Sequence, residues 1–430
     1  MGELFLPINV PLDGEIEVPG DKSISHRAVI FASLAKGTSN ITHFLDGEDC
    51  MRTVDVFRSM GVVIEKQDNQ LIVEGKGLGS LKEPNQPLYF GNSGTTARLM
   101  CGLLAGLPFF SVVYGDVSLT QRPMDRIVIP LKQMNAQIEG RNEGKNLPLS
   151  IRGRKLKGMT YELPVKSAQV KSALLFAGLN ADGPTTIIEK TPTRNHTENM
   201  LQAFGANLEI EGDRMTIQPG KDFTAQDIFI PGDISSAAFF MVAAAIIPNS
   251  QVTLKNVGLN KTRTGILEVL TQMGGKLIIE NETSNSGEPM GDITVMQSTL
   301  KGIIIEGEII PRLIDEIPII ALLATQADGK TIIRNAKELR VKETDRIKAI
   351  VEVLQTMGAS IESTDDGMII HGKTTLTGGK VSSYGDHRIA MMCVVASLIV
   401  RGEIELDESQ SIAISYPNFF DDLKKLTSSE

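Results

Sequence analysis

One short plan recurs six times along this chain of 430 residues, with a period of roughly 70 residues. Each copy has an apolar strand, a polar turn with Gly, Ser and a charge, an Ala-rich helix, a strand, a second helix and a closing hairpin. The first helix of each copy is expected in the stretches that begin DKSISHR at Asp21, GNSGTTAR at Gly91, KSAQVKS at Lys166, GDISSAAF at Gly232, RLIDEIP at Arg312 and GDHRIAM at Gly385. A period this long exceeds that of solenoid repeats and predicts a set of small α/β modules.

The six modules divide into two groups of three, which predicts two domains of similar size. Three modules precede about Phe229 and three follow it. The first strand, Gly14–Val18, resembles a strand that opens a module of the second half. We therefore expect the chain to cross between domains near Gly20 and near Ile230, with residues 21–229 in one domain and residues 1–20 plus 230–430 in the other. Two linkers form a hinge, which favours closure on a ligand.

Composition excludes several classes of protein. Apolar residues make up 41% of the chain, which suits two large cores. The three cysteines are scattered and predict neither a disulfide framework nor a metal site. The longest apolar run, Ala237–Ile247, is too short to span a bilayer, and the N-terminus has neither the basic start nor the cleavage site of a signal peptide, so we expect a cytoplasmic protein. No apolar stripe or heptad pattern demands an oligomer, which favours a monomer.

The placement of the cations is more informative than the net charge of −9. An acidic chain is a poor candidate for binding nucleic acid, which needs clustered positive charge. Yet one set of cations falls at or just after the turns that begin helices: Lys22, Arg27, Arg98, Arg122, Arg194, Lys342, Arg346 and Arg388. The free N–H groups and the dipole at a helix start already favour anions. The sequence therefore predicts a cleft that binds a small, multiply anionic ligand.

Six motifs in order resemble those of the 5-enolpyruvylshikimate-3-phosphate (EPSP) synthases, of the enolpyruvyl transferase family: DKSISHR, GNSGTTAR, QRPM, KSAQVKSALL, RVKETDRI and GDHRIAM. The resemblance covers nearly the whole chain. It implies a two-domain α/β fold with three βαβαββ units in each domain, an inside-out α/β barrel, and an active site in the cleft between the domains. It also implies transfer of the enolpyruvyl group of phosphoenolpyruvate to the 5-hydroxyl of shikimate 3-phosphate, with release of phosphate, toward chorismate and the aromatic amino acids.

The same resemblance implies two sets of binding residues. Both substrates carry a phosphate and a carboxylate, so four anionic groups must be neutralised in one site. The residues expected to bind phosphoenolpyruvate are Lys22, Asn92, Gly94, Arg122, Gln169, Arg346, His387 and Arg388. Those expected to bind shikimate 3-phosphate are Lys22, Ser23, Arg27, Ser167, Ala168, Gln169, Arg194, Asp315 and Lys342. A side chain at Gly94 would protrude into the space of a small ligand held against the backbone.

The chemistry requires groups that move protons. An acid must protonate the methylene carbon of phosphoenolpyruvate while a base takes the hydroxyl proton, and elimination then reverses the proton transfer at carbon. We expect Glu343 to serve the carbon and Asp315 the 5-hydroxyl, with Lys22 as the alternative for that proton and for the departing phosphate. Glu343 as a plain salt-bridge partner of Lys342 or Arg346 is the competing interpretation. No metal or organic cofactor is expected.

Several polar residues near the motifs have simpler interpretations. Arg98 and Asp386 lie next to motifs and are as consistent with bracing them as with binding. His26 is expected to be a packed or hydrogen-bonded neighbour of Arg27. His43 and His371 have no partners in sequence and are expected at the surface.

The segment Gly367–Thr374 matches the phosphate-loop pattern GxxxxGKT literally. That pattern requires a flexible loop that opens a helix. Here the centre is Met-Ile-Ile, and LIVEGK and MTIQPGK occupy the same hairpin position in other modules. We therefore expect a strand at this position and no nucleotide site.

The chain departs from the most familiar pattern of the family. Leu99 stands where many members have Pro, Ala168 replaces a Ser, Glu338 stands where an Asn is common, and Ser415 stands where a Lys often contacts phosphoenolpyruvate. RNHTE at 194–198 and NKTR at 260–263 resemble the branch that tolerates the herbicide glyphosate, a competitor of phosphoenolpyruvate. The hypothesis is that the missing Lys and the loop near Leu99 weaken the inhibitor more than the substrate.

Two rival functions are weaker. UDP-N-acetylglucosamine enolpyruvyl transferases carry Lys-Asn at the first motif and a Cys in a mobile loop, whereas Lys22 is followed here by Ser23 and GDVSLTQRPMDR has no Cys. A non-catalytic anion-binding protein on the same scaffold would not need Glu343 and Asp315 beside both sets of cations.

Overall fold

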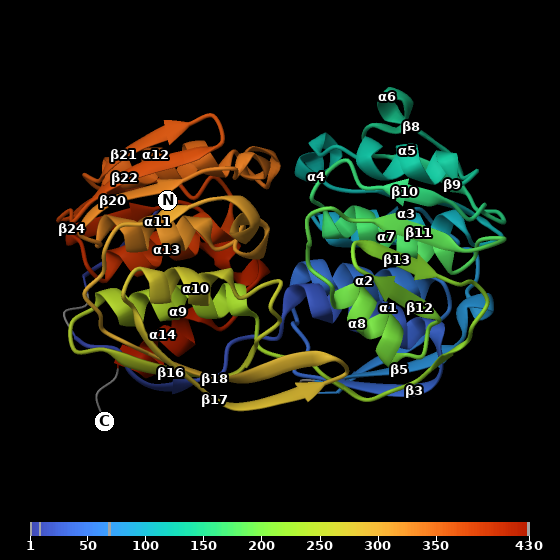
Figure 1. Cartoon of the computed structure of the whole chain (residues 1–430), viewed down its shortest axis with the longest axis horizontal. Coiled ribbons are helices and arrows are strands. Elements are labelled where there is room, and N and C mark those ends of the chain that lie inside the picture. The colour runs from blue at the N-terminus through green and yellow to red at the C-terminus, as the bar shows by residue number, and fades with distance from the viewer. Residues whose placement is uncertain (1, 8–9, 68–69, 428–430) are drawn as a thin grey trace. The chain divides into compact units, whose positions relative to one another are not determined.

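The computed structural model describes residues 2–7, 10–67 and 70–427, and the chain splits into two compact units (Figure 1). The N-terminal unit consists of Gly20–Ile230 and Ser284–Glu288. The C-terminal unit consists of Met1–Pro19, Pro231–Thr283 and Pro289–Glu430. In the described residues each unit contains three sheets, one for each module.

The N-terminal unit follows the expected modular plan. Its first module has α1 (Lys22–Leu34), β3 (Ala35–Thr42), α2 (Glu48–Ser59), β4 (Val63–Gln67), β5 (Gln70–Lys76) and the short 3₁₀-helix η1 (Leu78–Ser80). The second has β6 (Leu88–Tyr89), α3 (Gly94–Ala105), β7 (Phe110–Tyr114), α4 (Val117–Gln121), α5 (Asp125–Gln133), β8 (Gln137–Gly140), α6 (Arg141–Gly144) and β9 (Leu149–Arg152). The third has β10 (Thr160–Glu162), α7 (Ala168–Gly178), β11 (Thr185–Ile188), α8 (His196–Ala203), β12 (Leu208–Glu211) and β13 (Arg214–Ile217). The sheet orders are β14-β3-β5-β4, β6-β7-β9-β8 and β10-β11-β13-β12, where β14 (Phe223–Thr224) and β15 (Ile228–Phe229) both pair with β3.

The C-terminal unit repeats this plan. Its first module has β2 (Asp13–Ile16), α9 (Ile234–Ile246), β16 (Gln251–Gly258), α10 (Gly265–Gln272), β17 (Lys276–Asn285) and β18 (Glu288–Met296), and residues 284–288 at the end of this hairpin belong to the N-terminal unit. The second has β19 (Ile304–Ile305), η2 (Gly307–Arg312), α11 (Ile317–Thr325), β20 (Gly329–Ile333), η3 (Lys337–Val341), α12 (Arg346–Thr356), β21 (Ser360–Thr364) and β22 (Gly367–Gly372). The third has β23 (Thr377–Val381), α13 (His387–Ser397), β24 (Arg401–Leu406), η4 (Ser409–Ile414) and α14 (Phe419–Thr427), with β1 (Glu3–Phe5) beside β24. The sheet orders are β17-β18-β16-β2, β19-β20-β22-β21 and β1-β24-β23.

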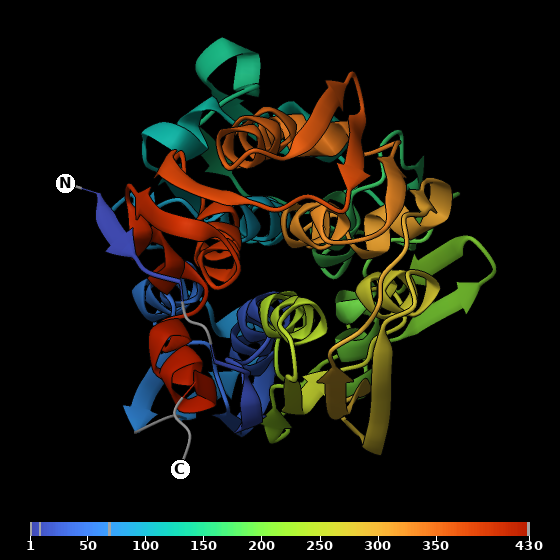
Figure 2. The same ribbon diagram turned by 90° about the vertical axis from the view of Figure 1, so that its left-hand side faces the viewer.

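The Ala-rich helices form the interior of each unit, and the strands lie outside them. Every residue of α11 is buried, and α9 is buried from Ile234 to Ala245. A helix that is apolar on all sides must be enclosed by other elements. In the C-terminal unit α9, α11 and α13 pack against one another, and Figure 2, which faces this unit, shows strands outside its central helices. The expected inside-out α/β architecture is confirmed.

Close helix packing in the N-terminal unit depends on one glycine. A Cβ on Gly102 of α3 would lie 2.1 Å from the carbonyl oxygen of Ala173 in α7. Real Cβ atoms do not approach an oxygen so closely, so only Gly lets these helices meet. This contact holds α3 against α7, and both helices begin with predicted binding motifs.

Details of the expected elements are partly confirmed and partly corrected. The first strand is β2, and it pairs in parallel with β16 of the C-terminal unit. The segment that resembles a phosphate loop contains β22, which pairs with β20 and β21, so the expected strand at this position is confirmed. The helix start expected at Arg312 is wrong, because residues 307–312 form the 3₁₀-helix η2 with Pro311 inside it. The helix begins five residues later at Ile317, with Pro318 in its first turn, where proline is tolerated.

Candidate active site

The polar residues of the recurring turns are helix caps. The side chain of Asp21 accepts a hydrogen bond from the N–H of Ile24 at the start of α1, at 2.9 Å. Ser93 does the same for Thr96 at the start of α3, at 3.2 Å. Because an N-cap satisfies one backbone donor and leaves the others of the first turn available, these starts can still hold an anion. The turn chemistry that the sequence repeats therefore places the predicted residues on the first turns of buried helices.

Two guanidinium groups converge on the bare backbone of Gly94 at the start of α3. A Cβ at this position would lie 3.2 Å from Nη1 of Arg98 and 3.3 Å from Nη1 of Arg122. Arg122 also donates to the carbonyl oxygen of Asn92 at 3.3 Å, to its side-chain oxygen, and to Ser118 at 3.3 Å. The result is a positively charged site over the backbone of Gly94, in which Asn92 orients Arg122.

The starts of α1 and α7 are tied to neighbouring helices by polar contacts. Gln169, on the first turn of α7, accepts a hydrogen bond from Arg98 at 2.5 Å and donates to Thr95 of α3 at 3.1 Å. Lys22, the first residue of α1, forms an ion pair with Asp49 of α2, and its side chain is 18% exposed. The predicted residues Gln169 and Arg122 are thus joined through α3, and Lys22 is held by α2.

Arg27 lies deeper than a simple ligand-binding arginine. It is 3% exposed, and its guanidinium donates to Thr197 at 2.6 Å, to Ser172 at 2.9 Å and to the carbonyl oxygen of Ser23 at 2.9 Å. Burial lowers the pKa of Arg27 to about 10, against the opposing effect of Glu198. Arg27 therefore stays charged at neutral pH, with hydroxyl groups as its direct partners in α7 and α8.

His26 is a packed residue, as expected from the sequence. It is fully buried, and its Nδ1 lies 2.7 Å from the hydroxyl of Thr53, which lies 2.7 Å from the hydroxyl of Thr96. Burial lowers the pKa of His26 to about 3. The imidazole is therefore neutral and links α1, α2 and α3 through a chain of hydroxyl groups.

The C-terminal unit holds its predicted residues around Arg346. This side chain is 1% exposed and donates to Asp386 at 2.7 Å, to Glu343 at 2.7 Å and to Asp315 at 3.1 Å. Burial lowers the pKa of Arg346, but the carboxylates of Asp386, Glu343 and Asp315 more than offset this, so the pKa ends above its ordinary value. Lys342 donates to the same Asp315 oxygen at 3.1 Å. One guanidinium thus positions both predicted proton-transfer carboxylates.

Arg388 and His387 occupy the first turn of α13 and are 8% and 3% exposed. Asp386 caps this helix by accepting a hydrogen bond from the N–H of Arg388 at 2.9 Å. Asp386 is itself fully buried, so it braces the motif and Arg346, which was one of its two sequence interpretations. Glu343 pairs with Arg346 yet keeps 28% of its side chain exposed, so the ion pair does not remove it from solvent.

The remaining predicted residues lie at helix starts of the N-terminal unit. Ser167, which caps α7, is half-buried, as are Ala168 and the turn residue Arg194 before α8. Sequence reasoning missed Asp49, because an acidic residue in the first turn of an amphipathic helix is ordinary. No group of three or more potential metal ligands occurs in the described ranges, and within them no helix has the length and apolarity of a membrane span.

Of the two histidines expected at the surface, one is not there. His43 is half-buried, its ring donates from Nδ1 to the carbonyl oxygen of Ile230 at 2.7 Å, and it stacks on Phe229. The expectation for His43 is wrong because residues 228–230, distant in sequence, lie beside β3. His371 is exposed, as expected.

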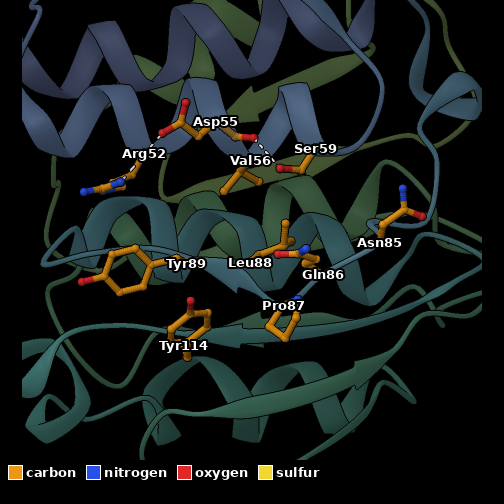
Figure 3. A pocket seen from close by; sticks show the side chains of 10 residues that line it. All are labelled: Arg52, Asp55, Val56, Ser59, Asn85, Gln86, Pro87, Leu88, Tyr89 and Tyr114. Atoms are coloured by element: carbon orange, nitrogen blue, oxygen red, sulfur yellow. Dashed lines mark hydrogen bonds and ion pairs between the residues drawn. The ribbon is translucent and has the colours of Figure 1, made fainter.

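A separate hollow of about 420 Å³ in the N-terminal unit lies between α2 and β6 (Figure 3). It contains none of the predicted site residues. The ring centroids of Tyr89 and Tyr114 lie 4.9 Å apart, and Arg52 stacks over Tyr89. Arg52 is paired with Glu48 at 2.8 Å and lies 3.8 Å from Asp55, so its charge is balanced. This hollow does not offer the positive potential that two multiply charged substrates require.

Comparisons with known proteins agree with the fold. Residues 7–423 match the family model described as EPSP synthase (3-phosphoshikimate 1-carboxyvinyltransferase). A relative from Oceanobacillus iheyensis named 3-phosphoshikimate 1-carboxyvinyltransferase is 58% identical over 98% of both chains, and one of the same name from Bacillus subtilis is 55% identical over 97% of both. An EPSP synthase structure from Acinetobacter baumannii has a TM-score of 0.89 and 45% identity, covering 98% of this chain and 97% of that one.

The fold and the family model define a transferase. The chain belongs to the EPSP synthase family, whose members act in aromatic amino acid biosynthesis with phosphoenolpyruvate and shikimate 3-phosphate as substrates.

Proposed function

We propose that this chain transfers the enolpyruvyl group of phosphoenolpyruvate to the 5-hydroxyl of shikimate 3-phosphate, and that phosphoenolpyruvate binds over Gly94. The observation that carries this proposal is the convergence of Arg98 and Arg122 on a residue without a side chain. Planar guanidinium groups suit a phosphate and a carboxylate that share a three-carbon frame. Lys22 and Asn92 are the other residues of this unit assigned to phosphoenolpyruvate, and Gln169 is an uncharged residue beside them.

Shikimate 3-phosphate is assigned to the adjoining helix starts of the same unit. Its phosphate takes the start of α7, where the backbone N–H groups of the first turn attract an anion. The residues assigned to this substrate are Lys22, Ser23, Arg27, Ser167, Ala168, Gln169 and Arg194. Arg27 already donates to three oxygens, so it acts on the substrate through its remaining N–H groups and through its charge.

The C-terminal unit supplies the proton-transfer groups. Asp315, with Lys342, serves shikimate 3-phosphate, and Asp315 removes the proton of the 5-hydroxyl as its oxygen attacks the central carbon of phosphoenolpyruvate. Glu343 protonates the methylene carbon, which becomes a methyl group. Elimination then breaks the bond to phosphate, which leaves with the proton first taken from the 5-hydroxyl, and Glu343 removes a proton from the methyl group to restore the double bond.

Arg346, His387 and Arg388 are assigned to phosphoenolpyruvate and to the departing phosphate. The contacts of Arg346 occupy four of its five N–H donors, so its main task is to fix Asp315 and Glu343. Arg388 has the more suitable position for direct binding, at the start of α13. Lys22 remains the alternative to Asp315 for the hydroxyl proton.

Phosphate release with shikimate 3-phosphate as acceptor tests the proposal, with UDP-N-acetylglucosamine as the competing acceptor. We expect Glu343→Gln to lower kcat on the order of 100-fold or more, because general acid–base groups contribute that much. Glu362→Gln, an exposed Glu on β21 of the same unit, is the matched control and should leave kcat unchanged. Full activity of Glu343→Gln would overturn the assigned role.

We further propose that both sets of residues act on one pair of substrates within one chain, in a monomeric cytoplasmic protein. Mixing the inactive variants Lys22→Met and Glu343→Gln tests this directly. A site built from one chain recovers no activity on mixing, whereas a site shared between chains recovers part of it. Light scattering of the purified protein gives the mass independently, and cell fractionation tests the location.

A further inference from the structure

A buried ion cluster in the N-terminal unit lies outside every role assigned so far. Lys171 of α7 is 1% exposed and bonds to Glu189 at 2.8 Å and to Glu198 at 2.7 Å. Glu189 and Glu198 are 9% and 3% exposed. A lysine is almost never fully buried unless paired, and here one cation serves two carboxylates. So costly an arrangement needs a structural reason at this position.

The two carboxylates stand at the two ends of one short segment, residues 189–198. Glu189 directly follows β11, and Glu198 lies in the first turn of α8. Lys171 therefore forms an ion pair with a residue at each end of this segment. The hydroxyl of Thr193 donates to the second oxygen of Glu189, and the next residue is Arg194. The segment that carries Arg194 is thus held at its start, its end and its middle.

The neighbours of these residues hold Arg27. Ser172 follows Lys171 in α7, and Thr197 precedes Glu198 in α8. Their hydroxyl groups lie 2.6 Å apart, and both accept hydrogen bonds from Arg27. Helices α7 and α8 are therefore joined in two ways, by the ion pair of Lys171 with Glu198 and by the hydroxyl groups that hold Arg27. A shift of α8 relative to α7 would disturb both.

We propose that Lys171 is a positioning residue that sets the conformation of segment 189–198, and through it the placement of Arg194 and Arg27 toward shikimate 3-phosphate. This inference rests on the proposed function, in which those two arginines bind that substrate. The second oxygen of Glu198 is buried and has no hydrogen-bond partner among the described residues. Without Lys171, Glu189 and Glu198 lose the cation that contacts both of them, and α8 must move to bring water to the two buried carboxylates.

The test is Lys171→Met, which keeps the length of the side chain and removes its charge. We expect KM and Kd for shikimate 3-phosphate to rise on the order of 10-fold to 100-fold, since small misplacements of binding groups have effects of this size. The KM for phosphoenolpyruvate at saturating shikimate 3-phosphate should change much less. Lys171→Arg, which keeps the charge, should restore most of the affinity. Calorimetric titration with shikimate 3-phosphate measures Kd without turnover.

A double-mutant cycle separates positioning from general destabilisation. Arg194→Met should weaken binding strongly in the wild-type chain and much less in the Lys171→Met chain, because the arginine is already misplaced there. Additive effects would overturn the proposal. The matched control is Lys190→Met, which removes the exposed pair of Lys190 with Asp213, 3.0 Å apart, from the same segment. It should leave Kd unchanged.

If Lys171→Met does not fold, Lys171→Met/Glu198→Gln reduces the uncompensated charge; it should fold and still bind shikimate 3-phosphate more weakly than wild type, and wild-type affinity would refute the positioning role. If Arg194→Met itself leaves Kd unchanged, the substrate assignment fails. If Arg194→Met weakens binding and Lys171→Met does not, only the present inference fails.

Discussion

Arg346 contacts the carboxylates of Asp315, Glu343 and Asp386, so Asp386→Asn is expected to lower both the stability and the activity of the protein. Asp386 is fully buried and accepts hydrogen bonds from Nε of Arg346 at 2.7 Å and from Nη2 at 3.3 Å. Asn caps a helix about as well as Asp, so the hydrogen bond from the N–H of Arg388 should survive. The substitution therefore removes a charge and sets an amide N–H against a guanidinium N–H, with little change in shape.

The magnitude follows from burial. Removing one partner of a buried ion pair typically costs about 3–5 kcal/mol of unfolding free energy. Asp315 and Glu343 still contact Arg346, so we expect the lower end, about 3 kcal/mol. In a unit of roughly 200 residues this corresponds to a fall in Tm of about 6–12 °C. The kcat should fall as well, because Arg346 orients both proton-transfer carboxylates.

Differential scanning calorimetry and phosphate-release kinetics together measure these effects. Glu405→Gln is the matched control, since it breaks the pair of Glu405 with Lys380, whose side chains are 40% and 77% exposed. Exposed pairs contribute little, so the control should melt with the wild type. The reasoning is refuted if Asp386→Asn also melts with the wild type, or if the control loses as much stability as the buried variant.

Three further predictions concern pH and the phosphoenolpyruvate site. Between about pH 6.5 and 3 the unfolded chain binds a proton at His26 that the folded chain does not, so the free energy of unfolding should fall on acidification by up to about 1.4 kcal/mol per pH unit from this residue. Chemical denaturation at pH 7.5 and 5.0 should show a smaller loss of unfolding free energy for His26→Asn than for the wild type. Equal losses in the two proteins would contradict this. Gly94→Ala should raise the KM for phosphoenolpyruvate about tenfold or more and leave the Kd of shikimate 3-phosphate unchanged, because the new methyl group meets both guanidinium groups; an unchanged KM in steady-state assays would count against the site. Ser415 is 5% exposed and Leu99 is fully buried. If these residues weaken the binding of glyphosate more than that of phosphoenolpyruvate, competition against phosphoenolpyruvate should give an inhibition constant for glyphosate above the low micromolar range. A lower inhibition constant would disprove the hypothesis.

Much of the fold could be predicted because the signals are local and repeated. A polar cap before an apolar, Ala-rich stretch marks a buried helix start wherever it occurs, as with Asp21, Ser93 and Asp386. The start expected at Arg312 was wrong because the 3₁₀-helix η2, which contains Pro311, occupies residues 307–312, and α11 begins only at Ile317.

The candidate site was predictable in its residue types and only partly in its contacts. The clustering of cations at helix starts and the family motifs indicated which residues to consider. The pairing of Lys22 with Asp49 had no sequence signal, because Asp49 resembles any acidic residue in a first helical turn. The same holds for His43, whose partner Ile230 is distant in sequence.

The sequence by itself determined the modular α/β architecture, the anionic character of the substrates and the family, since periodicity, caps and motif order survive without coordinates. Only the tertiary structure decided that Arg346 holds Asp315, Glu343 and Asp386 together, and that Lys171 closes both ends of the segment around Arg194. The physical reason is that an ion pair depends on distance and burial, and neither can be read from the separation of two residues along the chain.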